Sequence, residues 1–253
     1  MWRSLKPRSS GAAAVNAATL FFLARQSGWR PSRAEHSPRP FTSCRAEPRE
    51  PSVYETLSEH GRAVWNECAP LAGVAFDYLR ARCCAIPPAD GDLRWHRALK
   101  HPSGYCGPAL VGLVTDAITG EPISLHRTWI NADGSKADVD PCRMLLANHR
   151  SGGGVIRLWP DESVSTGLCV AEGIETALSA ALHFPPAWCV LNAGNLGKFP
   201  VLPGIDCLTI IVDNDPAGER ATRDCATRWN EHAEVCVIHP SAADLNDELR
   251  EAR

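Results

Sequence analysis

The segment that most constrains the fold is a short apolar run, residues 208–212, which ends at two aspartates, Asp213 and Asp215. A β-branched run bounded by turn-forming residues is typical of a buried strand in a parallel sheet. Ligands of open α/β sheets bind beyond the carboxyl ends of such strands. The two carboxylates therefore suit a hard cation, Mg²⁺ or Mn²⁺, although the same residues also occur in ordinary turns.

The rest of the C-terminal part alternates apolar runs with helical patterns. We expect strands at 167–171, 188–191, 207–212 and 235–238, helices at 174–182 and 217–229, a loop at 192–195, and a last helix capped by Asp244. The first helix is predicted from apolar residues at Ile174, Ala177, Leu178, Ala181 and Leu182. This alternation predicts a mostly parallel sheet over residues 165–253.

Acidic residues follow three of these predicted strands. Glu172 follows the first, Asp213 and Asp215 follow the third, and Asp244, with Asp247 close behind, follows the fourth. Because parallel strands end at the same edge of a sheet, we expect these side chains to converge there. Carboxylates so close would repel one another unless a divalent cation neutralised them.

The N-terminal part divides into three segments. Residues 1–50 are rich in basic residues, Ser, Pro and Ala, and we expect a disordered tail. Residues 51–90 predict two helices, and residues 91–160 predict a β-meander with strands at 109–114 and 123–130 joined by a turn at 117–120. Three cations of the meander region are candidates for phosphate contacts, with ordinary surface charge as the alternative: Arg127, Lys136 and Arg143.

Composition limits the possible partners. The 253 residues carry a formal charge of −3, so any nucleic-acid binding must come from a local patch. No apolar stretch reaches transmembrane length, and no membrane partner is expected. The 11 cysteines form no CxxC pair, which predicts reduced thiols and a cytoplasmic protein. Four of them lie in apolar runs and are expected to be buried: Cys169, Cys189, Cys207 and Cys236.

Two stretches carry a resemblance to a known family. VAEGIETALSA (170–180) and IVDNDPAGERA (211–221) resemble the Toprim domain that primases, topoisomerases and some nucleases share. They are especially similar to primase-like proteins of plasmids, phages and integrating elements. Farther upstream, LRWHRALKHPSG and EPISLHRTWINADGSK are similar, less specifically, to the N-terminal half of a primase catalytic core. The resemblance implies an α/β fold, a Rossmann-like Toprim domain preceded by a smaller α+β subdomain.

The resemblance also implies roles for the acidic residues. Glu172 matches the Toprim glutamate, a general acid/base, and Asp213 and Asp215 match the metal-binding DxD pair. Asp244 matches an additional acidic position for metal. The chain departs from the pattern at Thr176 and Asn246, where related primases often carry acids. Glu175 is no simple substitute, because it lies about 100° around the helix from Thr176.

The implied function is a Mg²⁺-dependent, DNA primase-like nucleotidyltransferase that uses single-stranded DNA template and nucleoside triphosphates. The sequence contains no zinc module and no Walker A motif, so a replicative helicase would act in trans. Two alternatives stay open, a non-catalytic nucleic-acid-binding accessory protein and a Toprim nuclease. A topoisomerase is disfavoured because every tyrosine lies outside 165–253. A dehalogenase-type phosphatase is also disfavoured. That family carries Thr or Val two residues after the second Asp of its DxD pair, and here that position is Ala217.

Overall fold

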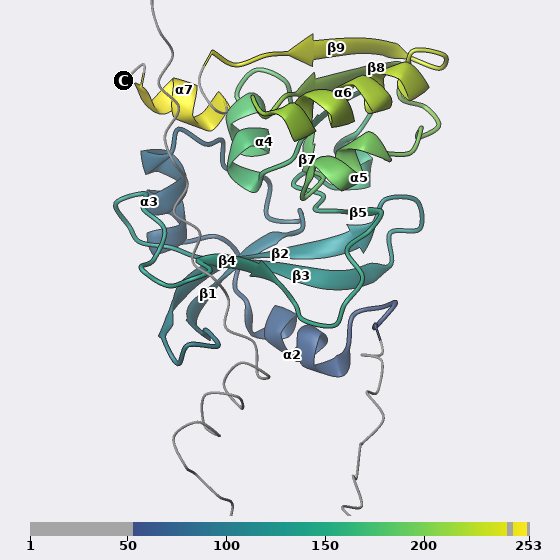
Figure 1. Ribbon diagram of the computed structural model, residues 1–253. Coiled ribbons are helices and arrows are strands. Elements are labelled where there is room, and N and C mark those ends of the chain that lie inside the picture. The colour runs from purple at the N-terminus through teal and green to yellow at the C-terminus, as the bar shows by residue number, and fades with distance from the viewer. Residues whose placement is uncertain (1–52, 242–244, 252–253) are drawn as a thin grey trace, which may run out of the picture. The chain divides into compact units, whose positions relative to one another are not determined.

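The computed structural model describes residues 53–241 and 245–251, which belong to one compact unit, Arg49–Arg253 (Figure 1). The predicted basic tail and Asp244 lie outside the described residues. Two sheets and the helices around them make up this unit. The domain boundaries expected from the sequence stay a prediction.

The first sheet is an antiparallel meander in the order β1-β2-β3-β4, with β5 paired to β2. Two helices, α2 (Glu59–Glu67) and α3 (Val74–Ala81), precede it, as the sequence predicted. The strands are β1 (Leu93–Lys100), β2 (Cys106–Asp116), β3 (Pro122–Trp129), β4 (Arg143–Leu145) and β5 (Gly154–Val155), followed by the 3-10 turn η1 (Asp161–Ser163). Gly120 has a φ of 71° in the β2–β3 turn, a conformation that glycine adopts without strain.

The second sheet is parallel throughout, in the order β7-β6-β8-β9. Its strands are β6 (Gly167–Ala171), β7 (Ala187–Cys189), β8 (Cys207–Ile211) and β9 (Glu234–Ile238). Its helices are α4 (Ile174–Ala180), α5 (Ala193–Gly197), α6 (Pro216–Trp229) and α7 (Leu245–Glu251). The expected α/β class, with a parallel sheet after an α+β region, is confirmed.

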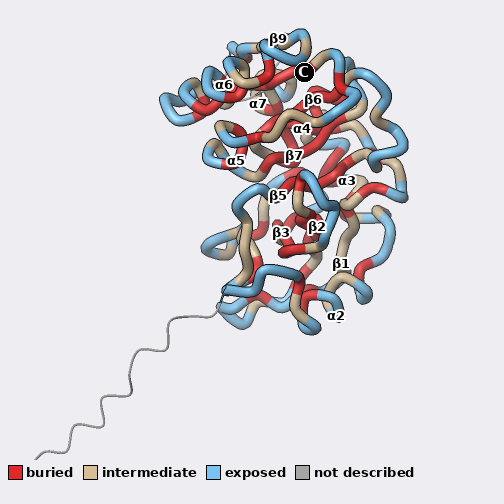
Figure 2. The backbone as a smooth tube through the Cα atoms, turned by 90° about the vertical axis from the view of Figure 1, so that its right-hand side faces the viewer, coloured by how far each residue is buried: buried red, intermediate tan, exposed pale blue. Residues whose placement is uncertain are grey.

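The two faces of the antiparallel sheet have different neighbours. On one face, Val111 and Trp129 share a core with residues of α2, such as Trp65. On the other face, Leu110 belongs to a core that includes Leu178 of α4. Burial is concentrated in the inner strands of the two sheets, β2 and β3 in the first and β6 and β8 in the second (Figure 2). The second core joins the meander directly to the parallel sheet, so the strand ends of both lie within reach of one site.

Three local expectations were wrong. Helix α4 ends at Ala180, and Leu182, which the helical pattern assigned to the buried stripe, is 50% exposed beyond it. The expected loop at 192–195 is the start of α5, because the Asn192 side chain caps that helix by accepting a hydrogen bond from the Asn195 N–H. Cys236 is exposed on the edge strand β9, and Cys207 is half-buried.

The expected burial is confirmed for two cysteines. Cys169 and Cys189 are buried, and every cysteine in the described part of the chain is a free thiol. Within the same residues, no helix combines the length and the apolar character needed to cross a membrane.

Candidate functional site

The carboxyl ends of β6 and β8 meet at one edge of the parallel sheet. The two strands are direct neighbours, with Val170 paired to Ile210, so the residues that follow each strand are brought together. The first turn of α6 passes close beside Glu172. A Cβ added to Gly218 would lie 3.3 Å from Glu172 Oε1 and 2.4 Å from the carbonyl oxygen of Asp213. Only glycine leaves room for the backbone of α6 to approach both groups so closely. The Glu172 carboxyl therefore lies beside the DxD segment.

The environment of Glu172 disfavours its charged form. Burial and, after it, the negative charges of Asp213 and Asp215 raise the pKa of Glu172 to about 7, although a hydrogen bond from the Ala193 N–H opposes the shift. Its Oε1 atom is buried and has no hydrogen-bond partner among the described residues. A carboxyl group in this position is suited to take up a proton near neutral pH or to bind a cation.

Asp215 has a structural task that the sequence did not reveal. Its Oδ1 accepts hydrogen bonds from the N–H groups of Ala217, at 2.7 Å, and Gly218, at 2.8 Å, and so caps α6. These bonds hold the pKa of Asp215 below its ordinary value. The side chain therefore remains ionised, with one oxygen engaged by the helix.

The carboxylates suit Mg²⁺, the ion that the fold implies. Within the residues that the structure describes, no three His, Cys, Asp or Glu side chains are grouped so as to hold a metal ion. Mg²⁺ needs fewer protein ligands, since it commonly binds one or two carboxylates and completes its shell with water and substrate phosphates. Glu172 offers a buried oxygen that has no hydrogen-bond partner among the described residues, and both this oxygen and the Asp213 backbone border the same Gly218 position. These residues could hold such an ion.

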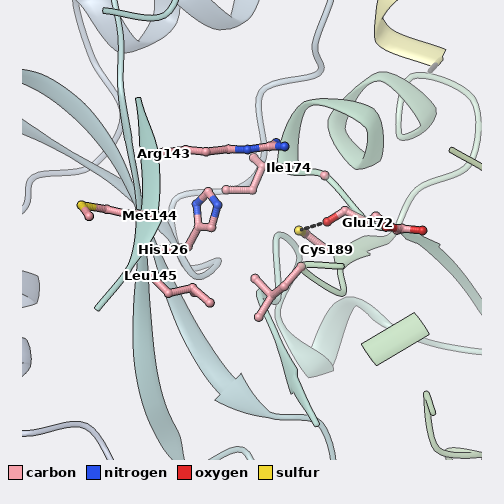
Figure 3. A pocket seen from close by; sticks show the side chains of 9 residues that line it. His126, Arg143, Met144, Leu145, Glu172, Ile174 and Cys189 are labelled. Carbon is pink, nitrogen blue, oxygen red and sulfur yellow. Dashed lines mark hydrogen bonds between the residues drawn. The ribbon is translucent and has the colours of Figure 1, made fainter. Parts of the chain in front are cut away.

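A pocket of about 240 Å³ separates this edge from the meander. His126 of β3 and Arg143 of β4 line it on one side, with Glu172 and Cys189 on the other (Figure 3). The Cys189 thiol donates a hydrogen bond to the carbonyl oxygen of Glu172, 3.1 Å away. The pocket thus places two nitrogen-bearing side chains opposite the backbone carbonyl of Glu172, whose carboxylate points away from them.

The three predicted phosphate-binding cations lie in different environments. Arg143 is exposed and lines the pocket with Glu172. Lys136 forms an ion pair with Glu175, with 3.9 Å between its Nζ and Oε1. Arg127 faces the other side of the sheet, where it donates to the carbonyl oxygen of Leu145, 2.9 Å away, and lines a separate pocket. Only Arg143 is brought beside Glu172, and the phosphate-binding role of all three stays a prediction.

Two residues near the site have roles that required the structure. Glu175 is buried and accepts a hydrogen bond of 2.6 Å from the Tyr78 hydroxyl. Lys136 and this hydrogen bond hold the pKa of Glu175 below its ordinary value in spite of burial, so it stays ionised. Asn246 is also buried, and its Nδ2 donates to Ser179 Oγ, 2.9 Å away, and to the carbonyl oxygen of Arg82. Asn246 therefore links α7 to α4, at the position where related primases often carry an acidic residue.

Two parts of the chain match known protein families. Residues 167–252 match the family profile described as Toprim domain, and residues 55–158 match one described as a domain of unknown function, DUF7146. The chain is therefore a Toprim-domain protein. No curated protein matches it significantly.

Two solved structures show similarity to the chain at low sequence identity. The primase fragment of the bacteriophage T7 primase-helicase protein has 16% identity and a TM-score of 0.46, over 90% of this chain and 81% of that one. A DNA primase domain from Pseudomonas aeruginosa has 11% identity and a TM-score of 0.39, over 72% of this chain and 56% of that one.

Proposed function

We propose that the protein is a Mg²⁺-dependent, DNA primase-like nucleotidyltransferase of a plasmid, phage or other mobile-element replication system, working in the cytoplasm. The observation that carries the proposal is the buried Oε1 of Glu172, which lies beside the DxD segment and has no hydrogen-bond partner in the described part of the chain. The Toprim domain supports a reaction on nucleic acid. The substrates would be a single-stranded DNA template and nucleoside triphosphates, with a replicative helicase supplied in trans.

In the proposed reaction, a nucleotide 3′-hydroxyl oxygen bonds to the α-phosphorus of a nucleoside triphosphate, and the bond to the bridging oxygen breaks to release pyrophosphate. Glu172 would take up the hydroxyl proton, a task that its pKa of about 7 suits. Asp213 and Asp215, with Asp244, would hold Mg²⁺, which supplies charge neutralisation and alignment of the reacting groups. Arg127, Lys136 and Arg143 would bind nucleotide or template phosphates.

Primer synthesis on single-stranded DNA tests the proposal. Labelled nucleoside triphosphates should be incorporated with Mg²⁺ and not with EDTA, and Asp213→Asn should abolish incorporation. Asp206→Asn is the matched control, because Asp206 is exposed and precedes the amino end of the same strand, β8. If the wild-type chain binds template and nucleotide but makes no primer with either Mg²⁺ or Mn²⁺, the proposal is wrong.

A second candidate is a nucleic-acid-binding accessory protein without turnover. It is favoured by the helix-capping role of Asp215 and by the absence of a carboxylate at Thr176 and Asn246. DNA binding without primer synthesis would support this candidate. Nicking of supercoiled plasmid with Mg²⁺ and no added nucleotide would instead identify a nuclease.

A further inference from the structure

The pocket opposite Glu172 contains two polar side chains that the protein itself leaves without hydrogen bonds. The Cys189 thiol and the Glu172 carbonyl satisfy each other. By contrast, among the residues that the structure describes, the His126 ring has no hydrogen-bond partner, and its Nδ1 is buried. Among the same residues, the guanidinium group of Arg143 forms neither a hydrogen bond nor an ion pair. A buried ring nitrogen without a partner costs free energy, which a ligand could recover.

The register of the meander directs His126 to this pocket. His126 pairs with Gly112 of β2 and Leu145 of β4, whereas its neighbour Arg127 pairs with Val111, which belongs to the core shared with α2. Alternate residues of a strand face opposite sides, so the imidazole projects toward the parallel sheet and Arg127 away from it. The ring lies beside Arg143 and faces Cys189 and the backbone carbonyl of Glu172, whereas the Glu172 carboxylate points away from the ring (Figure 3).

The charges around the ring favour an anionic ligand. Burial lowers the pKa of His126 to about 4; Glu175 opposes the shift, and Arg143, Lys136 and Arg127 add to it. The ring is therefore neutral at physiological pH and carries one N–H donor. A neutral donor next to an exposed guanidinium is complementary to a phosphate group, whose oxygens accept both kinds of hydrogen bond.

We propose that His126 is a positioning residue that donates a hydrogen bond to a phosphate oxygen of the bound nucleoside triphosphate, beside Arg143 on the meander side of the pocket. This inference rests on the proposed function for the identity of the ligand. The His126 hydrogen bond is an uncharged contact, and strand β3 fixes its direction. It would orient the triphosphate, whereas the charge of Arg143 attracts it. The contact joins the α+β region to the chemistry of the Toprim domain.

Equilibrium binding of ATP, measured by calorimetry without template, tests the inference on the full chain. His126→Ala should weaken ATP binding by roughly 10- to 100-fold, as expected for a lost hydrogen bond to a charged acceptor. His126→Gln, which keeps a side-chain N–H donor, should recover most of this loss. His232→Ala is the matched control, because His232 is exposed in the segment between α6 and β9. Equal urea midpoints for all variants would show that folding is unchanged.

Several outcomes would overturn the inference. One is that His126→Ala binds ATP as tightly as the wild type, and another is that the wild-type chain binds no ATP. A third is that His126→Ala weakens the binding of single-stranded DNA and leaves ATP binding unchanged. An NMR titration adds a direct readout, since the imidazole nitrogen signals of His126 should shift when ATP is added. If primer synthesis fails while ATP binding depends on His126, the proposed function is wrong and the inference stands. If synthesis proceeds and His126→Ala leaves the nucleotide KM unchanged, the inference alone is wrong.

Discussion

Replacing Glu172 with glutamine is expected to stabilise the metal-free protein at neutral and alkaline pH. The carboxyl is half-buried and faces the charges of Asp213 and Asp215, which together with burial raise its pKa from 4.5 to about 7. At 1.36 kcal/mol per pKa unit, this shift corresponds to a cost of about 3 kcal/mol for the ionised side chain. Because the carboxyl is partly open to water, screening reduces the expected effect to about 1–3 kcal/mol.

The sign follows from proton binding. Between pH 4.5 and 7 the folded protein binds the Glu172 proton more tightly than the unfolded chain does, so the free energy of unfolding falls as pH rises through this window. Glutamine does not titrate, so the free energy of unfolding of the variant does not fall in this way. The variant should therefore match the wild type near pH 4.5 and exceed it by the full amount above pH 7.

Urea unfolding in EDTA at pH 4.5, 6 and 8, followed by circular dichroism, measures the difference. Glu162→Gln serves as the control, because Glu162 is exposed in η1. Adding Mg²⁺ at pH 8 should stabilise the wild type more than Glu172→Gln, since a ligand stabilises the form that binds it. If the free energies of wild type and variant differ by the same amount at every pH, the carboxylates do not interact as described.

Substitutions at three further positions test other parts of the structure. Burial raises the pKa of Asp92 from 3.8 to about 6, so relative to Asp92→Asn the wild type should lose about 1–3 kcal/mol of stability between pH 4 and 6, measurable by urea unfolding. Glu175→Ala leaves the Tyr78 hydroxyl buried without its acceptor and should lower the free energy of unfolding by roughly 1–3 kcal/mol, whereas Glu175→Gln, which keeps an acceptor, should cost less. Asp215→Ala removes the cap of α6 and should lower Tm by roughly 2–4 °C, but Asp215→Asn keeps the cap and should melt like the wild type while losing any metal-dependent activity. Equal Tm values for the last two variants would exclude the capping role.

Local patterns predicted most of the fold. The β-branched run that became β8 and the helical spacing of apolar residues in α4 depend on near neighbours in the chain, and both elements formed where expected. Errors came where a longer-range contact or a cap decided the outcome. Leu182 continues the apolar spacing of α4 yet lies beyond its end, and the Asn192 cap turned an expected loop into α5.

For the candidate site, the sequence by itself determined which carboxylates would follow neighbouring strands, because strand ends in a parallel sheet share an edge. Only the tertiary structure decided what each side chain does there. Asp215 caps a helix, Glu175 binds Tyr78 from 97 residues earlier in the chain, and His126 faces the pocket while Arg127 turns away. Such contacts join segments that no local pattern relates, since they depend on how two sheets pack against each other.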